Sequence, residues 1–229
     1  MDTGFNQEFY DFLSGFLTDN RKQLFEKIIQ FRTRHLTVVL EDIYQPHNAS
    51  AVLRSADLTG VQDIHIIENK NRYHVNPQVA MGSSKWLNLI HYNEKEDNTM
   101  TAYNALHAKG YKIVAATPHS HGKSLDELQL DNKLAIVFGT ELKGLTQKAI
   151  DNADEYLWIP MYGFTESYNI SVSAALTLFT LTEKLRKSDI NWQLTEFEKK
   201  EILLEWTRRS VARSDVFERE FFLRKNKTF

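Results

Sequence analysis

The strongest constraint on the fold is a regular alternation, in the middle of the chain, of short apolar runs with helix-forming segments. Six runs rich in Val, Ile and Leu are predicted to be strands, at residues 36–40, 63–67, 87–91, 111–116, 134–138 and 155–159. Nearly continuous apolar character is typical of strands that are covered on both faces. The helical segments between them supply the crossovers that parallel pairing requires. The sequence therefore predicts an α/β fold, with a mainly parallel sheet and helices on both faces.

The two ends of the chain lie outside this alternation and are predicted to form short amphipathic helices. The helices are expected at residues 5–16, 19–32, 194–209 and 215–222. We therefore divide the chain into an N-terminal helical extension at 1–34, a central domain at 35–188 and a basic C-terminal helical extension at 189–229.

Charge is unevenly distributed, since the whole chain carries a net charge of −2 while both ends are basic. The clustered cations are Arg21, Lys22, Lys27, Arg32 and Arg34 at one end and Arg208, Arg209, Arg213, Arg219, Arg224, Lys225 and Lys227 at the other. A charge run is usually a solvated helix face. Two basic ends around a neutral centre would nevertheless suit an RNA-facing surface.

Composition excludes several classes of site and location. There are no cysteines, which excludes disulfides, thiolate zinc sites and cysteine nucleophiles. His119 and His121 form a tempting pair, but no nearby carboxylate cluster completes a metal site, so we expect no metal. The N-terminus lacks a signal-peptide pattern, and no apolar run approaches the ~18 residues of a membrane span. We expect a cytoplasmic protein with no membrane partner.

Three predicted strands end in turns that contain glycine or small residues, at 116–118, 138–144 and 159–161. In parallel sheets ligands bind at the carboxyl ends of strands, where backbone amides and carbonyls can bond a base or a ribose. The chain has no Gly-x-Gly-x-x-Gly after its first strand and no P-loop motif, so the usual sequence evidence for a dinucleotide site or a P-loop site is missing. The turns predict a pocket for a nucleotide-like ligand.

The stretch 159–176 joins the last strand to a helix whose small residues allow close backbone approach. Ser167 or Asn169 can cap the amides that open this helix. Taken alone, the stretch could equally be a capped core helix that leaves a strand.

Three motifs together resemble the SpoU family of RNA ribose 2′-O-methyltransferases. They are His-Asn-Ala-Ser-Ala-Val-Leu-Arg at 47–54, Phe-Gly-Thr-Glu-Leu-Lys-Gly-Leu at 138–145, and the stretch that begins Ile-Pro-Met-Tyr-Gly at 159 and continues to 175. The resemblance spans about 36–185. The segment 81–87 and the short helical ends are similar to the tRNA guanosine methyltransferases of that family.

The resemblance implies a domain of the SPOUT class with a C-terminal deep trefoil knot, an obligate homodimer with its active site at the interface, and S-adenosylmethionine (AdoMet) bound in the knot. The residues that it places against the cofactor are Ala116, Thr117, Gly139, Ile159, Met161 and Tyr168. Two positions depart from the family pattern. Tyr168 stands where relatives usually have Leu, and Glu166 stands where they often have Gln.

The resemblance also implies a catalytic set. We expect Arg54 to grip a phosphate and stabilise the developing alkoxide, because a guanidinium is almost always protonated. Asn48 could fix the ribose or Arg54, or simply cap its helix. Glu141 could hold Arg54 or the loop of the implied knot, or it could form a salt bridge at the start of a helix. Ser167 and Asn169 are candidates for substrate and interface contacts, against simple capping. The acceptor of the ribose proton stays open.

The implied activity is AdoMet-dependent 2′-O-methylation of tRNA, at the D-loop guanosine at position 18, with the basic ends gripping the tRNA. The alternatives are the same chemistry on rRNA or another tRNA position, and a catalytically silent RNA-binding relative.

Overall fold

The computed structural model describes residues 5–118 and 122–225. The chain forms two compact units, one of residues Thr33–Trp192 and one that combines Met1–Arg32 with Gln193–Phe229. The two terminal extensions therefore pack with each other. His119, His121 and Lys227 lie outside the described residues.

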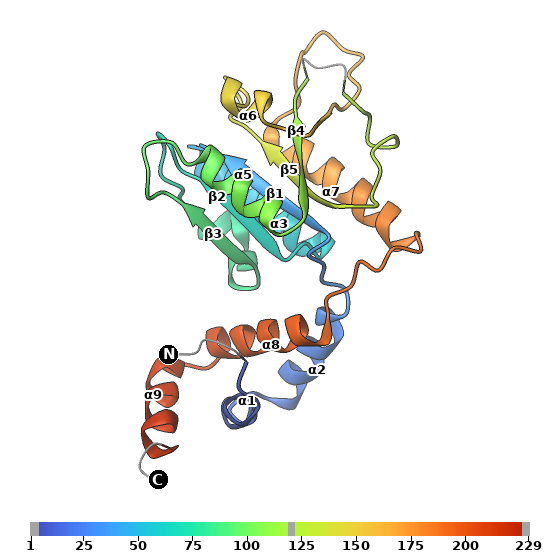
Figure 1. Ribbon diagram of the computed structural model, residues 1–229. Coiled ribbons are helices and arrows are strands. Elements are labelled where there is room, and N and C mark those ends of the chain that lie inside the picture. The colour runs from blue at the N-terminus through green and yellow to red at the C-terminus, as the bar shows by residue number, and fades with distance from the viewer. Residues whose placement is uncertain (1–4, 119–121, 226–229) are drawn as a thin grey trace. The chain divides into compact units, whose positions relative to one another are not determined.

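A six-stranded sheet forms the centre of the larger unit (Figure 1). Its strands are β1 Leu36–Glu41, β2 Asp63–Ile67, β3 Asn88–Tyr92, β4 Tyr111–Ala116, β5 Lys133–Phe138 and β6 Glu155–Leu157. They lie in the order β3-β2-β1-β5-β4-β6, and every neighbouring pair is parallel. The predicted parallel α/β sheet is confirmed. The strand order changes direction beside β1, which creates the crevice where such sheets bind ligands.

Helices cover both faces of this sheet, as the sequence predicts. Helices α3 (Pro46–Thr59) and α7 (Ile170–Arg186) pack on the face that carries Val38 and Ile64. Helices α5 (Thr99–Ala108) and α6 (Gln147–Asp151) pack on the opposite face, over Val39. Because adjacent strand residues point to opposite faces and both faces are covered, β1 and β2 are buried at every position.

One alternative for Asn48, that it caps its helix, is wrong. Helix α3 begins at Pro46, since proline is well suited to the first helical position. Its N-cap is Gln45, so Asn48 lies inside the first turn and is not a cap. The segment between β2 and β3 contains α4 (Pro77–Ala80) and the 3-10 helix η1 (Ser83–Lys85). Elements this short carry no readable period.

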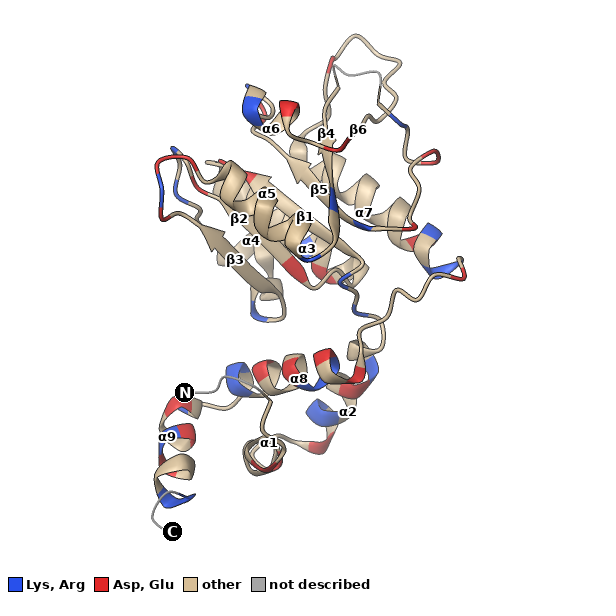
Figure 2. Cartoon of the chain, viewed as in Figure 1, with Lys and Arg blue, Asp and Glu red and all other residues tan. Residues whose placement is uncertain are grey.

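In its described part, the smaller unit consists of four helices, α1 (Gln7–Ser14), α2 (Asp19–Ile29), α8 (Glu196–Ser210) and α9 (Ser214–Lys225). Buried Phe9, Leu13 and Leu204 form one cluster, and the rings of Phe25 and Trp206 pack with centroids 5.4 Å apart. Acidic and basic residues are interspersed along these helices (Figure 2). The basic character of the ends is therefore partly neutralised by carboxylates of the same unit.

Candidate active site

A cavity of about 330 Å³ opens at the carboxyl ends of β4, β5 and β6. Its walls come from these strand ends, from the loop 139–145 and from the segment 159–173 that leads into α7. Six of the lining residues are those expected to contact the cofactor, namely Ala116, Thr117, Gly139, Ile159, Met161 and Tyr168. The three turns singled out in the sequence thus converge on one cavity, which lies within the usual size range of ~300–1,000 Å³ for small-molecule sites.

Gly139 shapes one wall of the cavity by having no side chain. A Cβ there would lie 2.2 Å from the carbonyl carbon of Gly144 and 2.3 Å from both Gly144 O and Leu145 N. The loop can approach this closely because Thr140 and Gly144 exchange two backbone hydrogen bonds, of 3.0 and 2.9 Å. Gly144 closes this turn with φ of 64°, in the region where glycine meets no steric penalty.

Asn169 joins three of the expected catalytic residues into one network. Its Nδ2 donates to Asn48 Oδ1 at 3.1 Å and to Glu141 Oε1. Its Oδ1 accepts from Ser171 N at 2.8 Å and from Ser171 Oγ at 2.5 Å, which caps α7. Both amide protons and two acceptor sites are used. In this arrangement Asn169 holds neighbouring groups in place and has no hydrogen bond left for a ligand.

The expected catalytic residues are only partly brought together in one chain. Glu141 and Ser167 line the cavity, and Asn48 is buried behind Asn169. Arg54, by contrast, is exposed on α3 and is not among the residues that line the cavity. A single chain therefore presents the pocket without the guanidinium.

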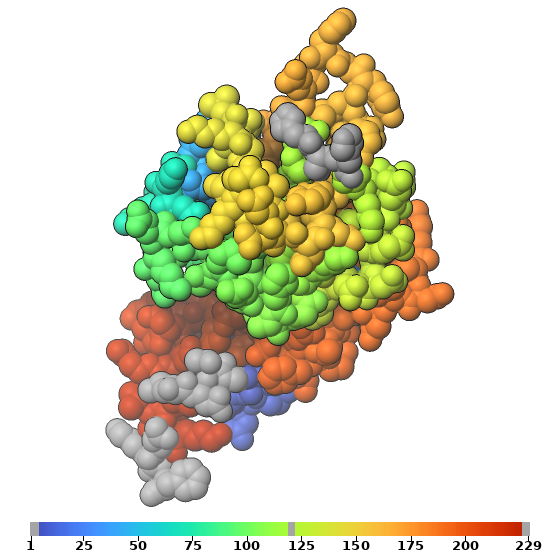
Figure 3. All heavy atoms as spheres, turned by 45° about the horizontal axis from the view of Figure 1, so that its top comes forward, coloured from blue at the N-terminus to red at the C-terminus, as the bar shows by residue number. Residues whose placement is uncertain are grey.

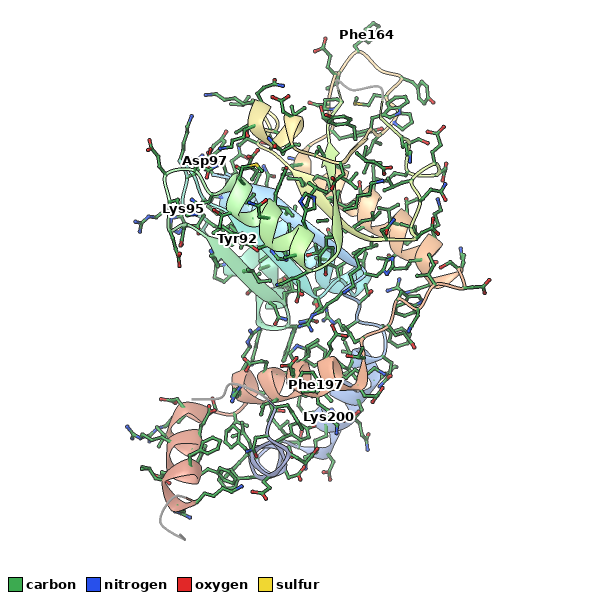
Figure 4. All side chains as sticks on the ribbon, in the orientation of Figure 1. Tyr92, Lys95, Asp97, Phe164, Phe197 and Lys200 are labelled. Atoms are coloured by element: carbon green, nitrogen blue, oxygen red, sulfur yellow. The ribbon has the colours of Figure 1, made fainter. Side chains whose placement is uncertain are left out.

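The segment after β6 stands out from the surface (Figure 3). Phe164, near its tip, is fully exposed and points outward (Figure 4). Met161, Glu166, Ser167 and Tyr168 of the same segment line the cavity. Glu166 therefore brings a carboxylate to the position where family members often carry an amide.

Glu155 begins β6, whose last residue, Leu157, lines the cavity. Burial raises the pKa of Glu155, but bonds from Lys112 Nζ at 2.6 Å and Lys123 Nζ at 2.8 Å outweigh burial and hold the pKa below its usual range. The carboxylate is thereby kept charged. Because Glu155 also binds Lys123, it holds the segment after β4 against the outer edge of β6, where Lys123 forms a parallel β-bridge with Leu157.

Lys143, Leu145 and Ser173 also line the cavity; they belong to the motifs identified in the sequence but were given no role of their own. Leu157, another lining residue, lies outside these motifs. Glu41, at the end of β1, was also missed, although a carboxylate directly after a buried apolar run is a readable signal because burying it requires hydrogen-bond donors.

Within residues 5–118 and 122–225, no group of three or more His, Asp or Glu is placed to hold a metal ion. No helix in the same described ranges is long and apolar enough to cross a bilayer.

The fold and the cavity define an α/β protein with a small-molecule site at the carboxyl ends of strands of a parallel sheet. The model of the SpoU rRNA Methylase family matches residues 35–179, and the chain belongs to this family.

One relative and two solved structures illustrate the breadth of the similarity. The tRNA (guanosine(18)-2'-O)-methyltransferase of Borreliella burgdorferi is 45% identical over 206 residues, which cover 90% of this chain and 93% of the relative. The crystal structure of the A. aeolicus TrmH/SpoU tRNA modifying enzyme matches with a TM-score of 0.76 and 24% identity, over 85% of this chain and 98% of that one. The AdoMet-bound rRNA methyltransferase from Sinorhizobium meliloti matches with a TM-score of 0.58 and 20% identity, over 69% and 59% of the two chains. A match of 206 residues also reaches into both helical ends of this chain.

Proposed function

We propose that this protein is an AdoMet-dependent tRNA 2′-O-methyltransferase that modifies guanosine 18. The observation that carries the proposal is the convergence of the three motif turns on one cavity, with Asn48, Glu141 and Asn169 joined at its edge. The substrate follows from the relative that is 45% identical along 93% of its own length and bears this activity in its name.

The cavity fits AdoMet in chemical character. Apolar side chains such as Ile159, Met161 and Leu157 can enclose an adenine ring, and the small wall at Gly139 lets backbone amides approach a ribose. Glu141 and Glu166 supply carboxylates at the rim, which suit a ligand that carries a sulfonium and an ammonium group.

When bound, AdoMet supplies an electrophilic methyl group on its sulfonium. The ribose 2′ oxygen would take this methyl as the sulfur–methyl bond breaks to leave a thioether, and it would release its proton to a basic acceptor. Arg54 is assigned to the phosphate and to the negative charge that develops on the ribose oxygen, since a guanidinium donates in a fixed fork and stays charged. The Asn48–Asn169–Glu141 network keeps the edge of the pocket in one geometry before RNA arrives.

The active enzyme is proposed to be a homodimer, because one face of the larger unit carries exposed apolar side chains. Val172, Leu176 and Phe179 are 44%, 40% and 64% exposed and lie on one stripe of α7. Leu58, 78% exposed, lies on the outward face of the neighbouring α3, one turn after Arg54. Most of α7 bears no charge (Figure 2). A second copy docked here would cover this patch and receive Arg54 at the interface.

Complementation between two inactive chains tests both parts of this assignment. Arg54→Ala should abolish methyl transfer and leave AdoMet binding within twofold, whereas Gly139→Ala should lose AdoMet binding. If Arg54 acts on the partner's pocket, the mixed dimer contains one intact site and regains activity. An inactive mixed dimer would place Arg54 in its own chain, and full activity of Arg54→Ala alone would remove the mechanism.

Binding of tRNA is proposed to use the cations of the smaller unit that carry no carboxylate partner. Arg208 is held by Glu205 and by Glu218 at 2.6 Å, which leaves little charge for a phosphate. Arg213 and Arg219 are exposed, and neither forms an ion pair within the described ranges. Replacing both with Gln should weaken tRNA binding and reduce its logarithmic salt slope by about 2, whereas Arg208→Gln should leave that slope unchanged. A slope unaltered in the double variant would refute the assignment.

A tritiated-methyl assay separates the candidate substrates. Unmodified tRNA should accept one methyl group per molecule, and a tRNA with another base at position 18 should accept none. Methylation of rRNA, or of another tRNA position, would favour the alternative substrates. No transfer to any RNA by protein that binds tRNA would favour a silent RNA-binding relative.

Two further features belong to the proposal. A deep trefoil knot is supported by the segment at Lys123, which runs along the outer edge of β6 and exchanges backbone bonds with Tyr156 and Trp158 at 2.9 and 3.0 Å. A cytoplasmic location is supported by the tRNA-modifying activity in the name of the Borreliella relative.

A further inference from the structure

Glu41 is a buried carboxylate that the proposed reaction does not use. It is the last residue of β1 and is only 1% exposed. Its oxygens accept three hydrogen bonds, from Thr99 Oγ1 at 2.9 Å, Thr146 Oγ1 at 2.8 Å and Thr146 N at 2.8 Å. A buried carboxylate is costly unless its lone pairs are satisfied, so this geometry specifies the positions of its donors.

Two of the three bonds come from a residue next to the cofactor pocket. Thr146 directly follows Leu145, which lines the cavity, and it is the N-cap of α6. Its hydroxyl donates to Glu41 and accepts from Ala149 N at 3.2 Å, so its rotamer is fixed from both sides. Glu41 and Thr146 are 105 positions apart in sequence, so this contact links β1 to the loop 139–145, which we call the pocket loop.

The pocket loop is thus held at two points. On its inner side the backbone of Gly144 and Leu145 presses on Gly139, where no Cβ would fit. On its outer side Thr146 is bonded to Glu41. The remaining bond of Glu41 goes to Thr99, at the start of α5, which does not line the cavity.

We propose that Glu41 is a positioning residue for cofactor binding. Through Thr146 it fixes the loop 139–145 against Gly139 and thereby sets the affinity for AdoMet, without touching the ligand. The inference rests on the proposed function only in taking AdoMet as the ligand of the cavity.

Matched substitutions at the two threonines test this role. Thr146→Val removes the hydroxyl bond at an exposed residue, and Thr146→Ser keeps it. Thr99→Val removes the equivalent bond on the side away from the pocket, at a residue that is 1% exposed. By calorimetry on the full chain, we expect Thr146→Val to raise the AdoMet Kd about tenfold, as for loss of one hydrogen bond to a charged group. Thr146→Ser and Thr99→Val should stay within twofold, although Thr99→Val is expected to lower the melting temperature more.

Steady-state kinetics adds a readout that a general loss of stability would not move. Thr146→Val should raise the KM for AdoMet while kcat at saturating AdoMet stays within twofold. Equal increases in Kd for Thr146→Val and Thr99→Val, or no increase for Thr146→Val, would overturn the proposal.

Hydrogen exchange on cofactor-free protein separates this inference from the proposed function. Amides of 139–146 should exchange faster in Thr146→Val and at the wild-type rate in Thr99→Val. If the wild-type chain bound no AdoMet, the proposed function would fail, and the exchange result would still decide whether Glu41 holds the loop. Unchanged exchange in Thr146→Val, or equal acceleration in both variants, would count against it.

Discussion

Replacing Gly139 with Ala adds a single methyl group at the point where the structure leaves least room. The new Cβ would lie 2.2 Å from the Gly144 carbonyl carbon, whereas ordinary contact begins near 3.4 Å. The backbone of 144–145 must therefore move by about 1.2 Å, because backbone atoms cannot rotate away as a flexible side chain can.

Two effects of this shift can be measured. Overpacking of this kind costs about 1–3 kcal/mol of stability. For a chain of this size that corresponds to a fall in melting temperature of roughly 2–12 °C. A wall displaced by about 1 Å should also weaken AdoMet binding, and methyl transfer should fall on the order of 100-fold, since a misplacement of that size costs about that factor in rate.

The matched control, Gly163, lies in the segment after β6, which carries several residues that line the cavity. At Gly163 an added Cβ would meet nothing closer than Thr165 N at 4.0 Å, so Gly163→Ala should bind AdoMet and melt as the wild type does. Calorimetry and thermal melting on the three proteins provide the test. Binding within threefold of wild type for Gly139→Ala, with an unchanged melting temperature, would refute the steric argument.

Three further outcomes are expected. Asn169→Asp should lower the free energy of unfolding by about 1–3 kcal/mol and should also lower kcat, because it replaces the donor to Asn48 and Glu141 with an oxygen that repels their oxygens. Thermal melting and the methyl-transfer assay measure the two effects. Wild-type stability and wild-type kcat in this variant would contradict the network. The depressed pKa of Glu155 contributes stability that is present above its unfolded pKa near 4.5 and is lost as pH falls through the lower folded pKa. Glu155→Gln should therefore flatten the acid limb of the stability profile in denaturant titrations, and an acid limb identical to the wild type would argue against this linkage. Phe179→Glu should shift the sedimentation coefficient towards a monomer by placing a charge on the apolar face of α7, and an unchanged coefficient would move the dimer interface elsewhere.

The sequence predicts the sheet well because burial on both faces leaves a strong signal. β1 and β5 are short, mostly apolar runs of six residues, which is typical of strands covered on both faces. The strand order does not follow from such signals, since the pairing of β1 with β5 depends on contacts between distant segments.

The parts of the candidate site that lie at the ends of strands could be predicted from the sequence. Gly139 and Ile159 stand at strand ends, so their convergence follows from the parallel sheet. The network around Asn169 and the hydrogen bonds from Thr146 to Glu41 could not be predicted, because both join residues that are far apart in sequence. The exposure of Arg54 likewise depends on how α3 packs, which the motif alone does not encode.

The central position of β1 in the sheet has a consequence for biosynthesis. Leu36 pairs with Leu134, 98 positions later, so β1 leaves the ribosome long before its partner strand exists. At a translation rate of ~5–20 residues per second, this delay lasts roughly 5–20 s. During that interval β1 can pair only with β2, and its other edge stays open to aggregation or chaperone capture. Synonymous codon changes that slow elongation between 68 and 133 should therefore lower the yield of soluble protein.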